Sequence, residues 1–204
     1  LFVAPRYSFD VNPPPVESNP ATSPSGFEVE CADPVVHRVL SDWLDASGMS
    51  WPGVFRLRAT VSEEPPFLPD TREVLRQPTV RIQAGPPSGT VRVSWGEAPA
   101  IAVVHPTRPE AELWFSPAAA SLLEKAERTF LLVVLVFVLR RLGWYHVHGA
   151  ALVDPLGRGW LIAGDSNCGK STTTALLASR GWGVCTDAIG FLASEPSGVA
   201  TLGF

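Results

Sequence analysis

One octapeptide restricts the fold of this 204-residue chain more than any other feature. Residues 164–171 read Gly-Asp-Ser-Asn-Cys-Gly-Lys-Ser and match the pattern G-x-x-x-x-G-K-[ST]. The apolar segment Trp160 to Ala163 precedes them, and a run of good helix formers, Ala175 to Ala178, follows. A strand, a glycine-rich loop and a helix in this order predict a phosphate-binding loop, in which backbone N–H groups and the helix N-terminus face phosphate oxygens.

This loop supplies the candidate nucleotide-binding residues. We expect Lys170 to reach the β- and γ-phosphates of a bound nucleotide, and the Ser171 hydroxyl to bind Mg²⁺. Cys168 is either an incidental small residue or a reactive thiol. The complete set of candidates for nucleotide contact is Gly164, Asp165, Ser166, Asn167, Cys168, Gly169, Lys170, Ser171 and Thr172.

A carboxylate is expected on the far side of the same site. A helix from Gly169 to about Arg180 leads away from the loop and ends at Gly181, and a strand from Gly183 to Asp187 returns over a similar length. Asp187 is therefore expected level with the phosphates, at the carboxyl end of its strand. There it would bind Mg²⁺ or take a proton from an acceptor hydroxyl; the alternative is an ordinary turn aspartate.

A histidine upstream of the loop is a further catalytic candidate. If Val153 pairs with Gly159 in a hairpin, the antiparallel register places His148 opposite Gly164, beside the phosphates. The alternative is a half-buried strand histidine with a structural role. His146 lies on the same strand face, but no third ligand accompanies the two rings, so a metal-binding pair is not favoured.

Proline and turn residues divide the rest of the chain. Residues 1–26 hold six prolines among Ser, Asn and Thr and are expected to be disordered or extended. Residues 27–116 are expected to form a β-rich region with a short helix near Pro34 to Ala46. The expected strands of this region are 55–61, 79–84, 90–95, 100–104 and 110–115.

Residues 117–204 are expected to hold one long helix followed by the nucleotide-binding core. The helix runs from Ala118 to Leu142, begins after Ser116 as N-cap and Pro117 at its first position, and is closed by Gly143. Its second half is apolar on nearly all sides and is expected to be buried. The expected strands of the core are 144–153, 159–163, 183–187 and 189–193.

Composition excludes several other classes of protein. Lys and Arg number 16 against 20 Asp and Glu, and no basic block occurs, so no nucleic-acid partner is expected. Three cysteines without a C-x-x-C pair fit neither a disulfide scaffold nor a zinc ribbon, and are typical of a cytoplasmic protein. The longest apolar run, 130–139, is about half the length of a membrane span, so no membrane partner is expected. The sequence does not begin with Met and its first residues do not predict a signal peptide, so we expect a fragment that is truncated at its C-terminal end.

The segment that contains these candidates resembles the catalytic core of the HPr kinase/phosphorylase family and its HPr-kinase-like ATP-binding relatives. The shared pattern is a strand ending in His-Gly at 148–149, the loop at 164–171, a helix ending in Arg-Gly at 180–181 and an acidic strand end at Asp187. The resemblance covers residues 144 to about 192. It implies an α/β fold with a P-loop core of HPr kinase type, a mixed sheet with helices, preceded here by the β-rich region.

The resemblance also implies an activity. Members of the family transfer a phosphoryl group from ATP to a serine hydroxyl with Mg²⁺, with the residue matching His148 near the reaction centre and that matching Asp187 as base or metal partner. The implied partner is a hydroxyl-bearing protein, peptide or small molecule. Ala188 stands where the family carries a second acidic residue, and the chain ends at Phe204 before the family's downstream Glu. A catalytically inactive nucleotide-binding regulatory module is therefore the alternative, and the oligomeric state, a homo-oligomer included, is left open.

Overall fold

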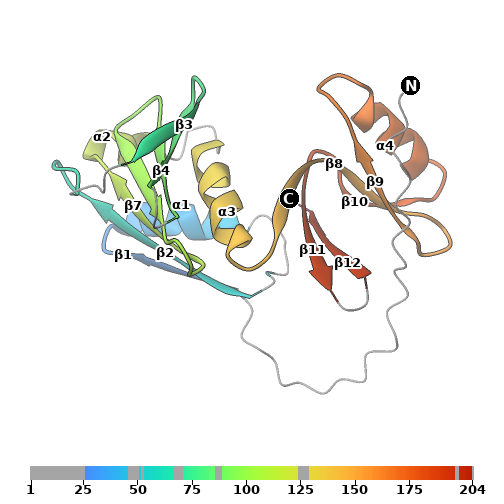
Figure 1. Ribbon diagram of the computed structural model, residues 1–204, viewed down its shortest axis with the longest axis horizontal. Helices are drawn as coiled ribbons and strands as arrows, with labels where there is room; N and C mark the ends of the chain where they lie inside the picture. Colours follow the sequence, from blue (N-terminus) through green and yellow to red (C-terminus); the bar gives the residue numbers. More distant parts are fainter. Residues whose placement is uncertain are drawn as a thin grey trace, which may run out of the picture. The chain divides into compact units, whose positions relative to one another are not determined.

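The computed structural model describes residues 26–45, 51, 53–66, 71–85, 89–123, 129–195 and 198–203. The expected Pro-rich segment lies outside these ranges except for its last residue. The chain forms two compact units, and it passes from the first to the second between Leu142 and Gly143 (Figure 1). Strands and helices occur in both units, so the fold is mixed α/β, as the sequence predicts.

The first unit is built on a seven-stranded mixed sheet in the order β1-β2-β7-β6-β5-β4-β3. The β1–β2 and β2–β7 pairs are parallel and the other pairs are antiparallel. A parallel pair needs a crossover connection, which helix α1 (Pro34–Asp45) provides between β1 and β2. The strands are β1 (Gly26–Cys31), β2 (Val54–Val61), β3 (Arg72–Arg76), β4 (Val80–Gly85), β5 (Thr90–Trp95), β6 (Ala100–Val104) and β7 (Glu110–Phe115).

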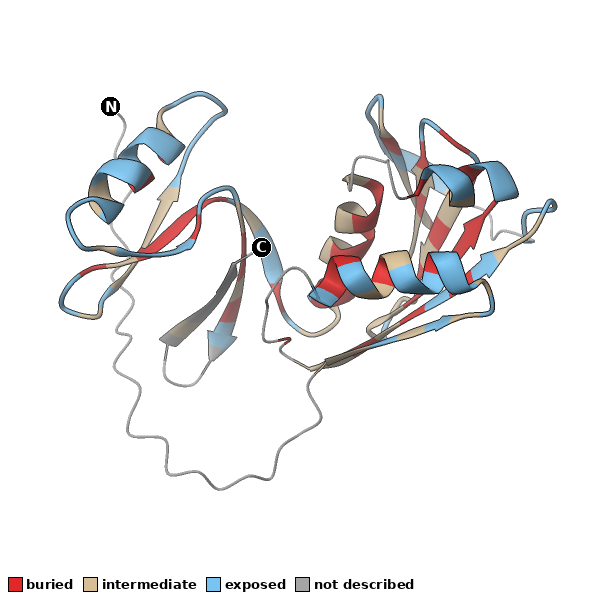
Figure 2. Cartoon of the chain, turned by 180° about the vertical axis from the view of Figure 1, so that it is seen from behind, coloured by how far each residue is buried: buried red, intermediate tan, exposed pale blue. Residues whose placement is uncertain are grey.

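Alternation along the strands separates an apolar face of this sheet from a polar one. On β2, Phe55 and Leu57 are buried, whereas Arg56 and Arg58 lie on the opposite face. Helix α3 (Thr129–Arg140) contacts β5, β6 and β7, with the Phe130 ring stacked 6.0 Å from that of Trp95. Figure 2 shows α1 with buried residues on one side and exposed residues on the other. The core of the first unit therefore lies between the apolar face and its helices.

The expected elements of the first unit are confirmed, and two strands were missed. The five expected strands correspond to β2, β4, β5, β6 and β7, and the expected short helix to α1. Strand β3 was missed because all five of its residues are exposed, so it carries no apolar alternation. Strand β1 does alternate Phe27 and Val29 with acidic residues, and this readable signal was overlooked.

The expected long helix is described as two helices, α2 (Pro117–Leu122) and α3, with residues 124–128 outside the described ranges. The predicted cap is confirmed, because the Ser116 hydroxyl accepts the Ala119 N–H at 3.1 Å. Both helices belong to the first unit, since α3 buries its apolar side on β5 to β7, and not to the nucleotide-binding core with which the sequence grouped them. Even α3 is too short to cross a membrane, and the same holds for every helix among the described residues.

The second unit, residues 143–203, is organised around one long strand. Strand β8 (Tyr145–Val153) pairs with β9 (Gly159–Ala163) on one side and with β10 (Gly183–Thr186) and β11 (Ile189–Glu195) on the other. All three pairings are antiparallel. Strand β12 (Gly198–Gly203) extends the sheet beyond β11, and helix α4 (Lys170–Ala178) connects β9 to β10. These elements match the sequence prediction, apart from β12, which was not expected.

The hairpin between β8 and β9 is held by a buried carboxylate. Asp154 Oδ1 accepts the N–H groups of Leu156 and Arg158 at 2.9 Å each, while Oδ2 accepts Arg158 Nε at 2.7 Å and Trp160 Nε1 at 3.1 Å. Burial by itself raises the pKa of this carboxyl, but the hydrogen bonds from Arg158, Trp160 and Leu156 outweigh it and lower the pKa from 3.8 to about 2. The charged carboxylate therefore stabilises the turn that sets the β8–β9 register.

Asp154→Asn is expected to destabilise the protein at neutral pH, because an amide NH₂ group then faces N–H donors. The folded pKa, about 2, lies below the ordinary 3.8, so the carboxylate contributes fully above pH 3.8 and its contribution is lost as the pH falls through about 2. The urea midpoint of the variant should be lower than that of wild type at neutral pH, and this difference should shrink below pH 3.8. Asp165→Asn, at an exposed carboxylate of the same unit, is the control and should change little. Equal midpoints for wild type and Asp154→Asn at neutral pH would contradict this role.

Candidate functional site

The site is assembled on the two sides of β8 at one position, Gly149. On one side Gly149 pairs with Ala163, the last residue of β9, which confirms the predicted hairpin register and puts His148 next to the start of the loop. On the other side Ala151 pairs with Thr186 and His148 pairs with Ile189. Strands β10 and β11 therefore lie one after the other along the same edge of β8, both antiparallel to it, and the two residues between them, 187–188, form a turn beside Gly149.

Close backbone approach explains the glycine at this position. A Cβ atom on Gly149 would lie 2.8 Å from the carbonyl oxygen of Ile162 in β9, closer than side chains tolerate. On the other side the Gly149 N–H donates to the carbonyl of Ala188 at 3.2 Å. A glycine inside an apolar strand is a sequence signal for such an approach, and the sequence interpretation gave it no role. Gly149 thus holds both the loop side and the Asp187 side close to β8.

The loop between β9 and α4 has the backbone conformation of an anion-binding turn. Asn167 has φ 63° and Gly169 has φ 90°, both in the left-handed region. Left-handed residues alternating with right-handed ones turn successive N–H groups toward one concave side. Gly169 is also the N-cap of α4 and offers no side-chain cap to the first turn. The first N–H groups of α4 are therefore left for a ligand, next to the positive end of the helix dipole.

The buried Lys170 side chain holds this loop together by hydrogen bonds to its backbone. Its ammonium donates to the carbonyl oxygens of Gly164 and Asp165 at 2.9 Å each, and the residue is only 8% exposed. Thr174 Oγ1 donates to the Lys170 carbonyl at 3.0 Å and ties the first turn of α4 to the second. An ammonium has three protons, so one remains for a phosphate oxygen while the other two hold the loop.

The turn that carries Asp187 is held by its neighbour Thr186. The Thr186 hydroxyl is buried and donates to the carbonyl of Ile189 at 2.7 Å, which bridges the turn at 187–188. Together with the bond from Gly149 to Ala188, this fixes the turn at both ends. Sequence reasoning did not assign Thr186 this role; a threonine directly before an aspartate at a strand end is the signal that would have indicated it.

A pocket of about 420 Å³ joins these parts. It brings together the two predicted catalytic residues and most of the predicted loop residues, and it also includes Ala188. The lining residues are His148, Ser166, Asn167, Gly169, Lys170, Ser171, Thr172, Asp187 and Ala188. Residues that the sequence separates by up to 40 positions thus face one space. Among the side-chain oxygens on its wall, the Ser171 hydroxyl and the Asp187 carboxylate are of the type that Mg²⁺ prefers.

Three of the predicted loop residues do not line this pocket. Gly164 and Asp165 supply the carbonyl groups that receive Lys170. Cys168 is a free, exposed thiol whose Sγ packs over Gly164, where a Cβ would come within 2.7 Å of it. These residues shape the loop around the lysine and do not face the pocket.

The two histidines of β8 have different surroundings. Burial against neighbouring atoms, with the nearby His148 as the second cause, lowers the pKa of His146, whose ring also packs edge-on to Phe191 at 5.8 Å. His148 lines the pocket. No group of three or more His, Cys, Asp or Glu side chains that could hold a metal ion occurs among the described residues, so the two rings gain no further ligand there.

Comparisons with known proteins add no relative. A scan of protein-family models, a search of curated proteins and a search of solved structures each found no match to this chain.

Gly149→Ala is expected to loosen the pairing of β8 with β9, because the new methyl group would meet a backbone carbonyl that cannot rotate away. Overpacking of this kind costs about 1–3 kcal/mol. Hydrogen exchange of the β8 and β9 amides should become faster in the variant. Gly183→Ala is the matched control, since its Cβ would have its nearest neighbour at 3.8 Å. Unchanged protection in Gly149→Ala would show that the close approach is unimportant.

Proposed function

We propose that this protein binds Mg-ATP in the 420 Å³ pocket and transfers its γ-phosphoryl group to a hydroxyl-bearing acceptor, as an HPr-kinase-like phosphotransferase. One observation carries the proposal. One pocket is lined both by Lys170 and Ser171, which supply the cation and the hydroxyl of a phosphate loop, and by Asp187 and His148. Phosphoryl transfer needs this combination, because catalysis there consists mainly of positioning and charge stabilisation.

Each residue has a defined part in this reaction. The N–H groups of the loop and of the first turn of α4 bind the phosphates, and the third proton of Lys170 bonds a β- or γ-phosphate oxygen. Ser171 and Asp187 would hold Mg²⁺, which neutralises charge on the phosphates. The acceptor oxygen bonds to the γ-phosphorus while the bond to the β,γ-bridging oxygen breaks, and the hydroxyl proton passes to Asp187. His148, which also lines the pocket, would orient the acceptor hydroxyl.

A nucleotide-binding regulatory module without catalysis is the second candidate. Of the described residues that line the pocket, Asp187 is the only carboxylate, and Ala188 follows it where a second acidic side chain would help to hold the metal. For phosphotransfer this one carboxylate would have to serve both as metal ligand and as base. The two candidates agree on nucleotide binding and differ on turnover, so two measurements separate them.

Lys170→Met is expected to weaken Mg-ATP binding by about tenfold or more, because a charged hydrogen bond to a phosphate contributes roughly 1.5–3 kcal/mol. Calorimetry on the full chain measures the effect, and circular dichroism verifies that the variant remains folded. Arg180→Ala removes an exposed cation after α4 and serves as the control with unchanged affinity. Equal affinity of Lys170→Met and wild type would exclude the loop as the nucleotide site.

Asp187→Asn is expected to reduce phosphotransfer or ATP hydrolysis by roughly 10² or more while nucleotide affinity changes much less, as for loss of a positioned acid–base group. Turnover is followed by release of ADP, with Asp42→Asn, at an exposed carboxylate of the first unit, as control. If ATP binds but turnover stays at background and is indifferent to Asp187→Asn, the regulatory module replaces the kinase.

A further inference from the structure

Asn167, in the loop between β9 and α4, has a backbone conformation that its residue type does not favour. Its φ of 63° lies in the left-handed region, where the Cβ atom of an L-amino acid crowds the backbone. The other described residues with positive φ are all glycines, which have no Cβ and adopt this conformation without steric strain. A side chain at position 167 is therefore present at a cost in backbone energy, and strain of this kind is typical of functional sites.

The usual local reason for a left-handed asparagine does not apply here. Asparagine is tolerated in this region because its short side chain can hydrogen-bond the neighbouring backbone. In the described part of the chain, however, the Asn167 carboxamide has no hydrogen-bond partner. The loop is held by Lys170, which donates to the carbonyls of Gly164 and Asp165, and by the Cys168 N–H, which donates to the carbonyl of Asp165. The carboxamide is thus not used to build the loop and is left for a ligand.

Asn167 is placed where such a ligand would bind. It is exposed and lines the 420 Å³ pocket together with Lys170. Asp187 and His148 line the same pocket. A carboxamide ends in an NH₂ group that has two donor protons and carries no charge. Asn167 can therefore donate to an oxygen of a group held in this pocket.

The outermost phosphate of the proposed nucleotide is the group that this donor suits. Backbone N–H groups of the loop and of the first turn of α4 hold the phosphates that lie against the backbone. A side chain extends farther from the loop than a backbone N–H does, so its donor serves a phosphate that lies farther out. In a nucleotide whose γ-phosphoryl group faces Asp187 and His148, the outer phosphate is the γ-phosphate.

The absence of charge on the side chain also fits this place. Besides glycine, asparagine and aspartate are the residue types that visit the left-handed region most readily. An aspartate at position 167 would offer only acceptors and would repel the phosphates. Asparagine combines tolerance of this backbone with the ability to donate a hydrogen bond.

We propose that Asn167 is a specificity-determining residue that selects a nucleoside triphosphate over a diphosphate, by donating a hydrogen bond from its carboxamide to an oxygen of the γ-phosphate. The inference rests on the proposed function, because it requires that the pocket binds Mg-ATP. It adds that the contact is made to the group that is transferred. The contact is therefore lost with the γ-phosphate, which favours release of ADP and entry of the next ATP.

The test is calorimetry of the full chain with Mg-ADP and with the Mg²⁺ complex of the β,γ-imido analogue of ATP, which is not turned over. Asn167→Gly should weaken binding of the analogue by about tenfold, because a hydrogen bond to a charged group is lost, and should leave ADP affinity nearly unchanged. Circular dichroism verifies that the variant is folded, which glycine at a left-handed position favours. Ser179→Gly, at the exposed end of α4 and outside the pocket, is the control and should bind both nucleotides as wild type does.

A second variant separates the carboxamide from the backbone. Asn167→Ala keeps a Cβ in the left-handed region but lacks the carboxamide, so it should lose as much affinity for the analogue as Asn167→Gly. Wild-type affinity for the analogue in Asn167→Gly would overturn the inference. An equal loss for ADP and the analogue would also overturn it, because the contact would then not be to the γ-phosphate.

The same measurements separate a failure of this inference from a failure of the proposed function. If wild type binds neither nucleotide, the proposed function is wrong and the inference falls with it. If Lys170→Met weakens binding of the analogue while Asn167→Gly binds it as wild type does, the nucleotide site stands and only the role of Asn167 is overturned.

Discussion

The backbone pairing of β8 is the constraint on which the second unit depends. Strand β8 pairs with β9 along one edge and with β10 and β11 along the other. Three segments from different parts of the sequence are therefore aligned by one strand. At Gly149 the partners come closest, with Ile162 O on one side and the bond to Ala188 O on the other. Any larger residue there would push the loop side and the acidic turn apart. The distance between the phosphate loop and Asp187 is therefore set by a residue that carries no functional group.

The phosphate loop combines local and non-local stabilisation. Left-handed residues at 167 and 169 and the uncapped start of α4 are local features that aim N–H groups into the pocket. Lys170 adds a contact within the loop by bonding the carbonyls of Gly164 and Asp165. Asp187 and His148 arrive only through the sheet. The proposed phosphotransfer depends on both levels, because binding uses the loop and turnover uses the residues that face it.

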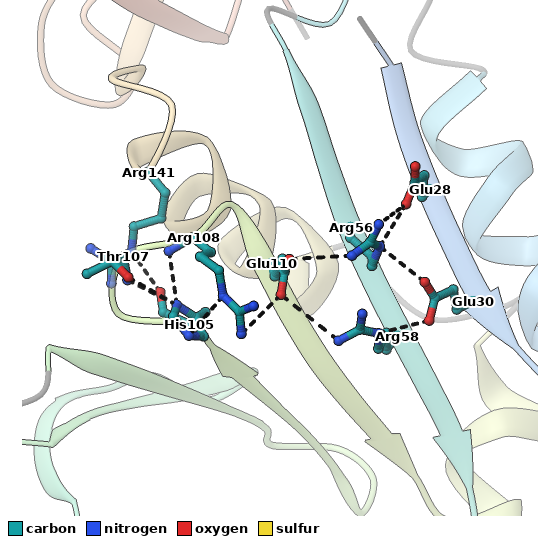
Figure 3. Close-up of polar contacts among 9 residues, drawn as sticks. All are labelled: Glu28, Glu30, Arg56, Arg58, His105, Thr107, Arg108, Glu110 and Arg141. Carbon is teal, nitrogen blue, oxygen red and sulfur yellow. Dashed lines mark hydrogen bonds and ion pairs between the residues drawn. The ribbon is translucent and has the colours of Figure 1, made fainter. Parts of the chain in front are cut away.

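The first unit uses charge differently. Its helices bury the apolar face of the seven-stranded sheet, and the opposite face carries alternating rows of glutamate and arginine, such as Glu28, Arg56 and Glu110 on neighbouring strands (Figure 3). Exposed pairs of this kind contribute little to stability one by one. Arg58, Glu110 and Glu112 of this face also line a pocket of about 210 Å³ beside His105.

Much of this protein could be predicted from local pattern. Alternation of apolar and polar residues indicated most strands, Ser116 with Pro117 indicated a helix start, and the octapeptide at 164–171 indicated the loop between β9 and α4, because each of these depends on neighbours within a few residues. Tertiary structure alone decided four things. It assigned the helices α2 and α3 to the first unit, since packing chooses the partner of an apolar helix. It revealed strand β3, whose residues are all exposed and therefore show no apolar alternation. It also revealed the pocket beside His105, whose lining residues come from several different strands. It also decided how near Asp187 lies to the loop, because a strand register links residues far apart in the chain and leaves no local signal.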